Sequence, residues 1–252
     1  MIERSQASGG VAVIVQARMG SSRLPGKTME PLGDRLVIDW VMERLRSASL
    51  VTEVLVATTD LVEDDVLVEH LRGQGVFTVR GSPDDVLSRY VRALDDTSAQ
   101  ILARVTADCP FIDPGIVDLG VTRLVECKVD YAATGLDGRF PRGLDAEVFT
   151  REALTRADAE TVNAEEREHV TPFIYRNPDI FRCTPIVAPG WAARPDLRFT
   201  LDEPADLDVL NAVIEALSAD PTTPTRDIID FLDKHPEVVA MNASVEHRTV
   251  EF

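Results

Sequence analysis

Three basic side chains, Arg18, Arg23 and Lys27, fall within a stretch of ten residues. The residues between them include four small ones: Gly20, Ser21, Ser22 and Gly26. Small residues let backbone N–H groups approach an anion closely, and the positive charges attract one. The stretch follows the apolar run 11–15, and open α/β sheets bind ligands at the carboxyl ends of their strands. We therefore predict that this first loop, residues 16–27, binds phosphate groups.

Two other interpretations of the first loop remain open. The letters Gly26-Lys27-Thr28 match the end of a P-loop, GxxxxGK[ST], but that motif needs a glycine where this chain has Ser21. The loop could also be a solvated basic turn after a strand. Three cations left together without partners are electrostatically unfavourable, which argues for a bound anion.

Two aspartates follow predicted strands, and the first of them is placed to reach a ligand at an edge of the sheet. Asp108 follows the predicted strand 101–105, at the end where open α/β sheets bind ligands. Asp202 follows a later predicted strand and precedes Pro204. Each also has a structural interpretation: Asp108 as a turn residue, and Asp202 as the N-cap of the helix that begins near Pro204. Asp113 is the evident cap of the next helix along the chain, which leaves Asp108 free for a ligand.

The rest of the sequence alternates apolar runs with helical patterns. The β-branched run 11–15 is typical of a buried parallel strand. The alternation predicts an α/β fold: a single, mainly parallel sheet flanked by helices on both faces. In the first half we expect strands at 11–15, 54–57, 76–79 and 101–105, and helices at 36–45, 64–71, 84–94 and from 114 onward. In the second half we expect a loop at 131–142, strands at 146–149 and 198–201, and helices at 151–176, 204–217 and 224–234.

The composition excludes several classes of protein. The chain has 26 Lys and Arg against 43 Asp and Glu, a net charge of −17, so its surface repels nucleic acid and anionic membranes. A hydrophobic content of 44% excludes a chain disordered throughout. The sequence contains no apolar run of 18 residues, so we predict no membrane span. Three cysteines form no disulfide scaffold or CxxC metal site and fit a reducing, cytoplasmic compartment. We therefore expect no nucleic-acid or membrane partner.

The first loop resembles that of the CTP-dependent cytidylyltransferases that activate sugar acids such as 3-deoxy-manno-octulosonate and acylneuraminate. The similar residues are Arg18-x-x-Ser21-x-Arg23-Leu24-Pro25-Gly26-Lys27. Gln16-Ala17-Arg18 is similar to the spore-coat polysaccharide branch, whereas the sugar-acid enzymes tend to have Pro-Ala-Arg. The resemblance covers about residues 11–215 and implies a Rossmann-like, nucleotide-diphospho-sugar transferase (GT-A-like) architecture.

The resemblance implies roles for particular residues. Arg18 and Lys27 would be the catalytic groups on the β- and γ-phosphates, and Asp108 and Asp202 would hold Mg²⁺, which suits carboxylate ligands. The implied nucleotide-binding residues are Ala17, Gly20, Ser21, Ser22, Arg23, Arg80 (beside the cytosine ring) and Thr106. Two later segments look like acceptor-binding segments and imply contacts from Asp145, Glu147, Arg167 and His169. The alternative for these segments is an ordinary strand and an exposed helix face.

We therefore expect an enzyme that transfers CMP from CTP to a small anionic or sugar-like acceptor and releases pyrophosphate, with Mg²⁺ as cofactor. The expected organisation is a loose leader (1–10), one domain (11–234) with a nucleotide-binding half (11–128) and an acceptor-binding half (129–234), and a tail (235–252). The resemblance also suggests a homodimer. One alternative is a glycosyltransferase using a nucleotide-sugar, although the only Asp-x-Asp, Asp206-Leu-Asp208, lies in a helical pattern. The other is a non-catalytic nucleotide-binding relative.

Overall fold

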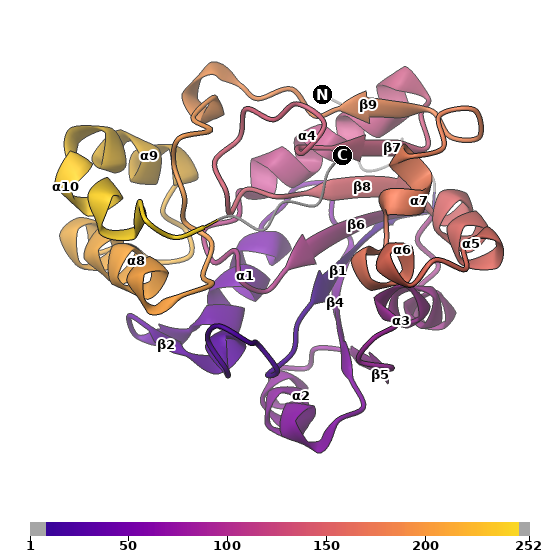
Figure 1. The fold of residues 1–252 in the computed structure, drawn as a ribbon, viewed down its shortest axis with the longest axis horizontal. Helices are drawn as coiled ribbons and strands as arrows, with labels where there is room; N and C mark the ends of the chain where they lie inside the picture. Colours follow the sequence, from indigo (N-terminus) through magenta and orange to yellow (C-terminus); the bar gives the residue numbers. More distant parts are fainter. Residues whose placement is uncertain (1–8, 247–252) are drawn as a thin grey trace.

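The computed structural model describes residues 9–246, in which one seven-stranded sheet organises the chain (Figure 1). The strand order is β5-β4-β1-β6-β8-β7-β9. The strands are β1 Val11–Gln16, β4 Glu53–Thr59, β5 Thr78–Gly81, β6 Ile101–Thr106, β7 Tyr131–Ala133, β8 Glu147–Thr150 and β9 Cys183–Pro185. β8 is antiparallel to both of its neighbours, and every other pair in this sheet is parallel. The predicted, mainly parallel sheet is confirmed.

Helices cover both faces of the sheet. The alternating side chains of β1 explain why: Val11, Val13 and Val15 enter one core and Ala12 and Ile14 the other. The first core is completed by α1 Val37–Arg46, α2 Asp65–Gly73, α4 Pro114–Cys127, α8 Pro204–Leu217 and α9 Thr225–Lys234. The second contains residues of α3 Val86–Ala93, α5 Arg151–Glu160 and α7 Pro172–Tyr175, with α6 Ala164–His169 contacting α3. A short hairpin, β2 Pro31–Leu32 and β3 Arg35–Leu36, follows the first loop.

The second half differs from the sequence prediction in three places. The helix expected over 151–176 is three helices, α5, α6 and α7, because Asn163 and Thr171 each begin a new one. The loop expected over 131–142 begins with β7. The strand expected over 198–201 is wrong: the segment makes one isolated bridge, between Arg142 and Arg198, and lies outside the sheet.

The chain end also differs from expectation where it is described. Residues of the predicted tail form α10 Pro236–Val239 and a short 3₁₀ turn, Ala240–Asn242. Asn242 is buried and donates to Asp206 Oδ1 at 2.9 Å, so this stretch packs against α8. Most of the predicted leader (1–8) and the rest of the tail (247–252) lie outside the described residues. Among residues 9–246, no helix has the length and apolar character needed to cross a membrane.

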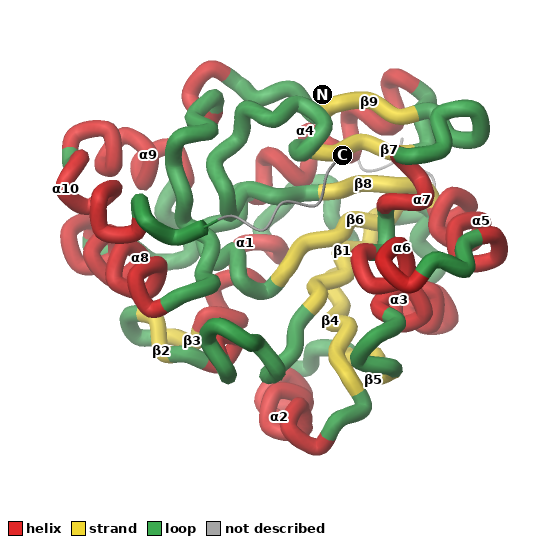
Figure 2. Tube along the Cα trace, viewed as in Figure 1, coloured by secondary structure: helices red, strands yellow, loops and turns green. Residues whose placement is uncertain are grey.

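Long loops follow the ends of β1, β7 and β9. Figure 2 shows these loops, in green, between the central strands and helices α8 and α9. The first loop leaves β1 there, and the turn that contains Asp108 leaves the neighbouring β6. The segment before α8 joins them, because Leu201 N donates to Asp108 O at 2.7 Å. Three segments far apart in sequence therefore meet at one edge of the sheet.

Candidate active site

The first loop is folded around the peptide groups of Met19. Met19 O accepts from the amides of Ser21 and Gly26, each at 2.9 Å, and Met19 N donates to Asp64 Oδ1 at 2.6 Å. Gly26 has φ +79°, a conformation that favours glycine, so its small size has a structural reason here. These bonds fix the loop around a cavity of about 210 Å³, which it lines from Gln16 to Thr28.

Lys27 joins the three segments through its ammonium group. Its Nζ donates to Asp108 Oδ2 at 2.7 Å, to Asp202 Oδ1 at 2.8 Å and to Leu201 O at 2.7 Å. Only 13% of the Lys27 side chain is exposed. Although burial alone would lower the pKa of Lys27, the two carboxylates raise it above its ordinary value. The ammonium therefore stays charged and holds the two aspartates together.

The two carboxylates stay ionised for the same reason. Burial by itself would raise the pKa of Asp202, but Lys27, Arg198 and Arg23 together lower it to about 2. Burial likewise opposes ionisation of Asp108, and attraction to Lys27 with a hydrogen bond from Thr106 lowers its pKa below the ordinary value. Both aspartates are therefore anionic at neutral pH.

Asp202 is not the N-cap of α8. Glu203 occupies that position, and the amides of Asp202 and Glu203 donate to the buried Asp206 at 2.9 and 3.0 Å. Arg198 in turn donates to Asp206 Oδ1 at 2.8 Å and to Asp202 Oδ2 at 2.9 Å. Because Asp206 satisfies the helix start, the Asp202 carboxylate is free to face Lys27 and Arg23. Asp113 caps α4 as expected, accepting from the amide of Ile116 at 3.0 Å.

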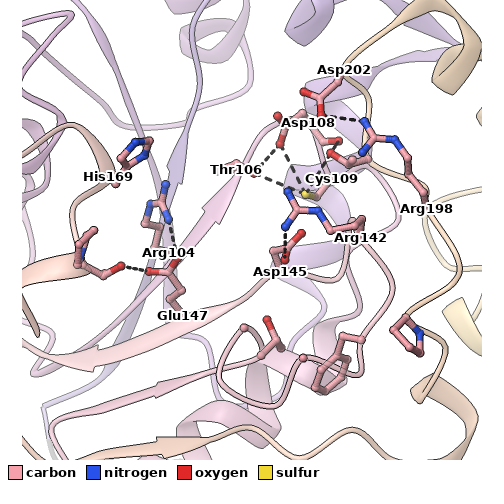
Figure 3. Close-up of a pocket in the computed structure, with 18 of the residues that line it drawn as sticks. Arg104, Thr106, Asp108, Cys109, Arg142, Asp145, Glu147, His169, Arg198 and Asp202 are labelled. Carbon is pink, nitrogen blue, oxygen red and sulfur yellow. Dashed lines mark hydrogen bonds and ion pairs between the residues drawn. The ribbon is translucent and has the colours of Figure 1, made fainter. Parts of the chain in front are cut away.

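A second, larger cavity of about 570 Å³ adjoins the first (Figure 3). Residues from both halves of the chain line it. Arg104 on β6 pairs with Glu147 on β8 at 2.6 Å, and the Glu147 carboxylate also accepts from Thr171 Oγ1 at 2.5 Å. Asp145 and His169 line other parts of the wall. Four residues line both cavities, which therefore meet at them: Arg23, Thr106, Asp108 and Asp202.

The structure brings most of the predicted site residues together. Thirteen were expected to act as catalytic, nucleotide-binding or acceptor-binding groups and two as metal ligands. Ten of the fifteen line the smaller cavity: Ala17, Arg18, Gly20, Ser21, Ser22, Arg23, Lys27, Thr106, Asp108 and Asp202. Asp145, Glu147 and His169 line the larger one. Their chemical roles stay predictions, but their placement at two adjoining cavities agrees with them.

Arg80 and Arg167 line neither of these two cavities. The Arg80 guanidinium donates to Thr59 O and Leu61 O, each at 2.8 Å, and pairs with Asp65 at 2.6 Å. Its contact with cytosine stays a prediction, with the guanidinium already held by β4 and the start of α2.

Arg167 is similarly held by carboxylates of two other segments. It pairs with Asp85, before α3, at 2.8 Å and with Asp158 on α5 at 2.7 Å. Its contact with an acceptor also stays a prediction.

Several residues at the site escaped the sequence prediction, and Asp64 and Arg142 are two of them. Asp64 is fully buried and, besides Met19 N, accepts from both threonines at the end of β4, Thr58 and Thr59. No local pattern distinguishes it from an ordinary first-turn carboxylate. Arg142 lines the larger cavity. It lies three residues before Asp145, a predicted acceptor-binding residue, and this proximity in sequence could have identified it.

Asp108 and Asp202 have the donors that a magnesium ion would take. Both are ionised, and one oxygen of each lies within 2.8 Å of the same nitrogen, so they converge on a single cationic position. Within residues 9–246, no group of three or more His, Cys, Asp or Glu side chains is arranged to hold a metal. A metal at this pair would therefore draw its remaining ligands from substrate or water.

Comparisons with known proteins agree with this geometry. A protein of Methanocaldococcus jannaschii of unassigned activity is 35% identical over 239 residues, covering 94% of this chain and 96% of its own length. The spore coat polysaccharide biosynthesis protein SpsF of Bacillus subtilis is 31% identical over 234 residues, covering 90% of this chain and 95% of its own.

Solved structures show the same relationship. A cytidylyltransferase from Leptospira borgpetersenii superimposes with a TM-score of 0.85 at 31% identity, over 94% of this chain and 99% of that one. CMP-2-keto-3-deoxy-manno-octonic acid synthetase, solved with CTP, shares the fold with a TM-score of 0.62 at 18% identity, over 82% and 99% of the two chains. The family model for cytidylyltransferases matches residues 12–235. The chain belongs to the cytidylyltransferase family and is a CTP-dependent nucleotidyltransferase.

Proposed function

We propose that this enzyme transfers CMP from CTP to a small anionic or sugar-like acceptor in a Mg²⁺-dependent reaction that releases pyrophosphate. The observation that carries the proposal is the junction of the two cavities. A triphosphate in the smaller cavity and an acceptor in the larger one would meet at Asp108 and Asp202. Such positioning, with neutralisation of charge, supplies most of the catalysis in phosphoryl-type transfers.

The first loop supplies the groups that hold the triphosphate. Arg18 lines the smaller cavity, is exposed, and makes no ion pair within residues 9–246. It is therefore available to the β- and γ-phosphates, together with Lys27. The amides of residues 20–23 face the α-phosphate in this proposal, as backbone N–H groups in small-residue loops commonly do. An acceptor oxygen then attacks the α-phosphorus, and pyrophosphate leaves toward Arg18 and Lys27.

Asp108 and Asp202 would hold the magnesium ion. When bound there, Mg²⁺ draws negative charge from the phosphate oxygens and so favours attack at phosphorus. In the structure, the Lys27 ammonium pairs with these same two carboxylates. When Mg²⁺ binds the carboxylates instead, the ammonium becomes available to the phosphate oxygens. An acceptor that is already an anion at neutral pH needs no strong base.

The position of the Asp-x-Asp argues against a glycosyltransferase. The Asp-x-Asp of the sequence lies within α8, where Asp206 is buried against Arg198. A nucleotide-sugar metal site of that type needs its aspartates at a strand end, facing the ligand.

Isothermal titration calorimetry tests the nucleotide half of the proposal. CTP, ATP, GTP and UTP are titrated with Mg²⁺ into the wild type, Lys27→Met and the control Lys234→Met, whose parent lysine is exposed on α9. We expect selective CTP binding that is lost in Lys27→Met and kept in the control. Preference for another nucleotide would refute the assignment of cytosine. Binding of CTP without pyrophosphate release on any acceptor of a broad panel would support the non-catalytic alternative.

A further inference from the structure

Four arginines line the larger cavity, and one of them differs from the others. Arg23, Arg104 and Arg198 each hold a carboxylate with an N–O distance of 3.0 Å or less. Arg142 has, within residues 9–246, a single ion pair, to Asp145 at 3.6 Å, and its buried Nε has no hydrogen-bond partner. Arg142 is therefore the arginine of this cavity whose guanidinium is left for a ligand.

The backbone around Arg142 is held firmly although its side chain is open. Arg142 N donates to Leu197 O at 3.1 Å, and Arg142 O accepts from Phe199 N at 2.9 Å. Gly143 has φ +105°, and a Cβ there would lie 2.8 Å from the backbone of residues 199–200. The Arg142 side chain is 40% exposed in spite of this close packing. The chain thus presents a guanidinium on a fixed support to the cavity.

Asp145 presents the opposite charge beside it. Its carboxylate is 41% exposed, accepts from Gly143 N at 3.1 Å, and faces Arg142 across the 3.6 Å gap (Figure 3). An anion that drew Arg142 away would leave the Asp145 carboxylate without its cation. A ligand that also carries an ammonium group would satisfy both residues at once.

The charge of the whole site favours the same kind of ligand. Four arginines and four carboxylates line the larger cavity, so their formal charges balance. The protein has a net charge of −17, and the proposed function places a strongly anionic triphosphate next to this cavity. A ligand with one positive and one negative group adds no net charge there, whereas a simple anion adds another negative charge.

We propose that Arg142 and Asp145 form the recognition pair for a zwitterionic acceptor, one that carries a carboxylate, phosphonate or phosphate group with an ammonium group close to it. The inference rests on the proposed function, because it assigns the larger cavity to the acceptor. Arg142 binds the anionic group and Asp145 the ammonium group. The pair therefore selects the acceptor by both of its charges.

The test compares small probes that differ by one charged group. Calorimetry measures the affinity of the enzyme for four probes: 2-aminoethylphosphonate, ethylphosphonate, ethylamine and gluconate. Each probe is added to enzyme saturated with Mg²⁺ and with a CTP analogue in which a methylene group bridges the α- and β-phosphorus atoms. The variants are Arg142→Met, Asp145→Asn and the control Arg139→Met, whose parent arginine is exposed, lies in the same loop and does not line the cavity. Affinity for the CTP analogue is measured first in every variant.

We expect the wild type and Arg139→Met to bind 2-aminoethylphosphonate about tenfold more tightly than any of the other three probes. One additional charge-assisted hydrogen bond changes affinity by about that factor. Arg142→Met should bind 2-aminoethylphosphonate about tenfold more weakly than the wild type does. In Asp145→Asn, the affinities for 2-aminoethylphosphonate and ethylphosphonate should become nearly equal. Analogue affinity should stay unchanged in both variants.

If the wild type binds gluconate or ethylphosphonate as tightly as 2-aminoethylphosphonate, the preference for a zwitterionic acceptor is overturned. An unchanged affinity in Arg142→Met, or no binding of any probe by the wild type, would overturn the assignment of the pair. A wild type that fails to bind the CTP analogue would instead refute the proposed function.

Discussion

Replacing Lys27 by methionine removes the cation that joins three segments of the site. Methionine keeps most of the side-chain volume but has no charge and no N–H donors. The Asp108 and Asp202 carboxylates, both ionised, would then face each other without the ammonium between them. Leu201 O would also lose its donor. The variant therefore tests whether this ion cluster holds the first loop, the Asp108 turn and the start of α8 together.

The size of the effect follows from burial. Removing one partner of a buried ion pair costs about 3–5 kcal/mol, because the remaining charge loses its compensation without regaining water. Asp202 keeps Arg23 at 3.0 Å and Arg198 at 2.9 Å, so the lower end of that range applies. A loss of about 3 kcal/mol lowers the Tm of a protein of this size by about 6–12 °C. Total stabilities are about 5–15 kcal/mol, so the variant should still fold.

Urea and thermal unfolding of the metal-free protein at neutral pH measure this loss. The control Lys234→Met removes an exposed lysine and should change the free energy of unfolding by less than about 0.5 kcal/mol. If Lys27→Met is as stable as that control, the reasoning is refuted, and the three contacts of Lys27 contribute nothing net. Mg²⁺ should stabilise Lys27→Met more than the wild type, because the ion would replace the missing cation between the two carboxylates.

Three further predictions concern the supports of the site. Burial alone would raise the pKa of Asp206, but its arginine partner and backbone amides lower it below the ordinary value. The ionised form therefore contributes stability above about pH 4, and this stability is lost as the pH falls through the lower pKa of the folded protein. Asp206→Asn should be less stable than the wild type at pH 7, and urea unfolding should show that difference in the free energy of unfolding narrowing toward about pH 3. Gly143→Ala should lose about 2–3 kcal/mol in the same assay, since its φ of +105° and a 2.8 Å backbone contact exclude a Cβ, while Gly190→Ala, at an open position, should lose much less. Asp64→Asn should weaken CTP binding about tenfold in calorimetry with the fold retained by circular dichroism, because an amide cannot accept from all the donors that fix the first loop; unchanged CTP affinity would contradict that role.

Local patterns predicted the parts of the fold that depend on neighbours in sequence. The β-branched run of β1 and the helical spacing of α1 and α8 place apolar residues on faces that must be buried, and the structure buries them. The basic first loop could be recognised because three cations among small residues are unfavourable without a nearby anion. Here that anion is partly the protein itself, since Lys27 and Arg23 both pair with Asp202.

The errors arose where a segment takes its partners from far away. Residues 198–201 have the composition of a strand, but their backbone bonds go to Arg142 and Asp108, so they brace the site instead of joining the sheet. An N-cap is the alternative interpretation of Asp202, and only the structure shows that Glu203 is the N-cap and that Asp206 accepts from the amides of both residues. Arg167 also takes its partners from other segments, Asp85 and Asp158, and its predicted contact with an acceptor stays a prediction.

The sequence by itself determined the α/β class and singled out the basic first loop with Asp108 and Asp202, because each of these depends on residue type and spacing along the chain. The tertiary structure decided which charges are already paired and which face a cavity. Arg142 is distinguished from the three other arginines by its longer ion pair and by its unpartnered Nε, and both depend on how β6, β8 and the segment before α8 pack together. Charge pairing is a property of neighbours in space, whereas a sequence gives only neighbours along the chain.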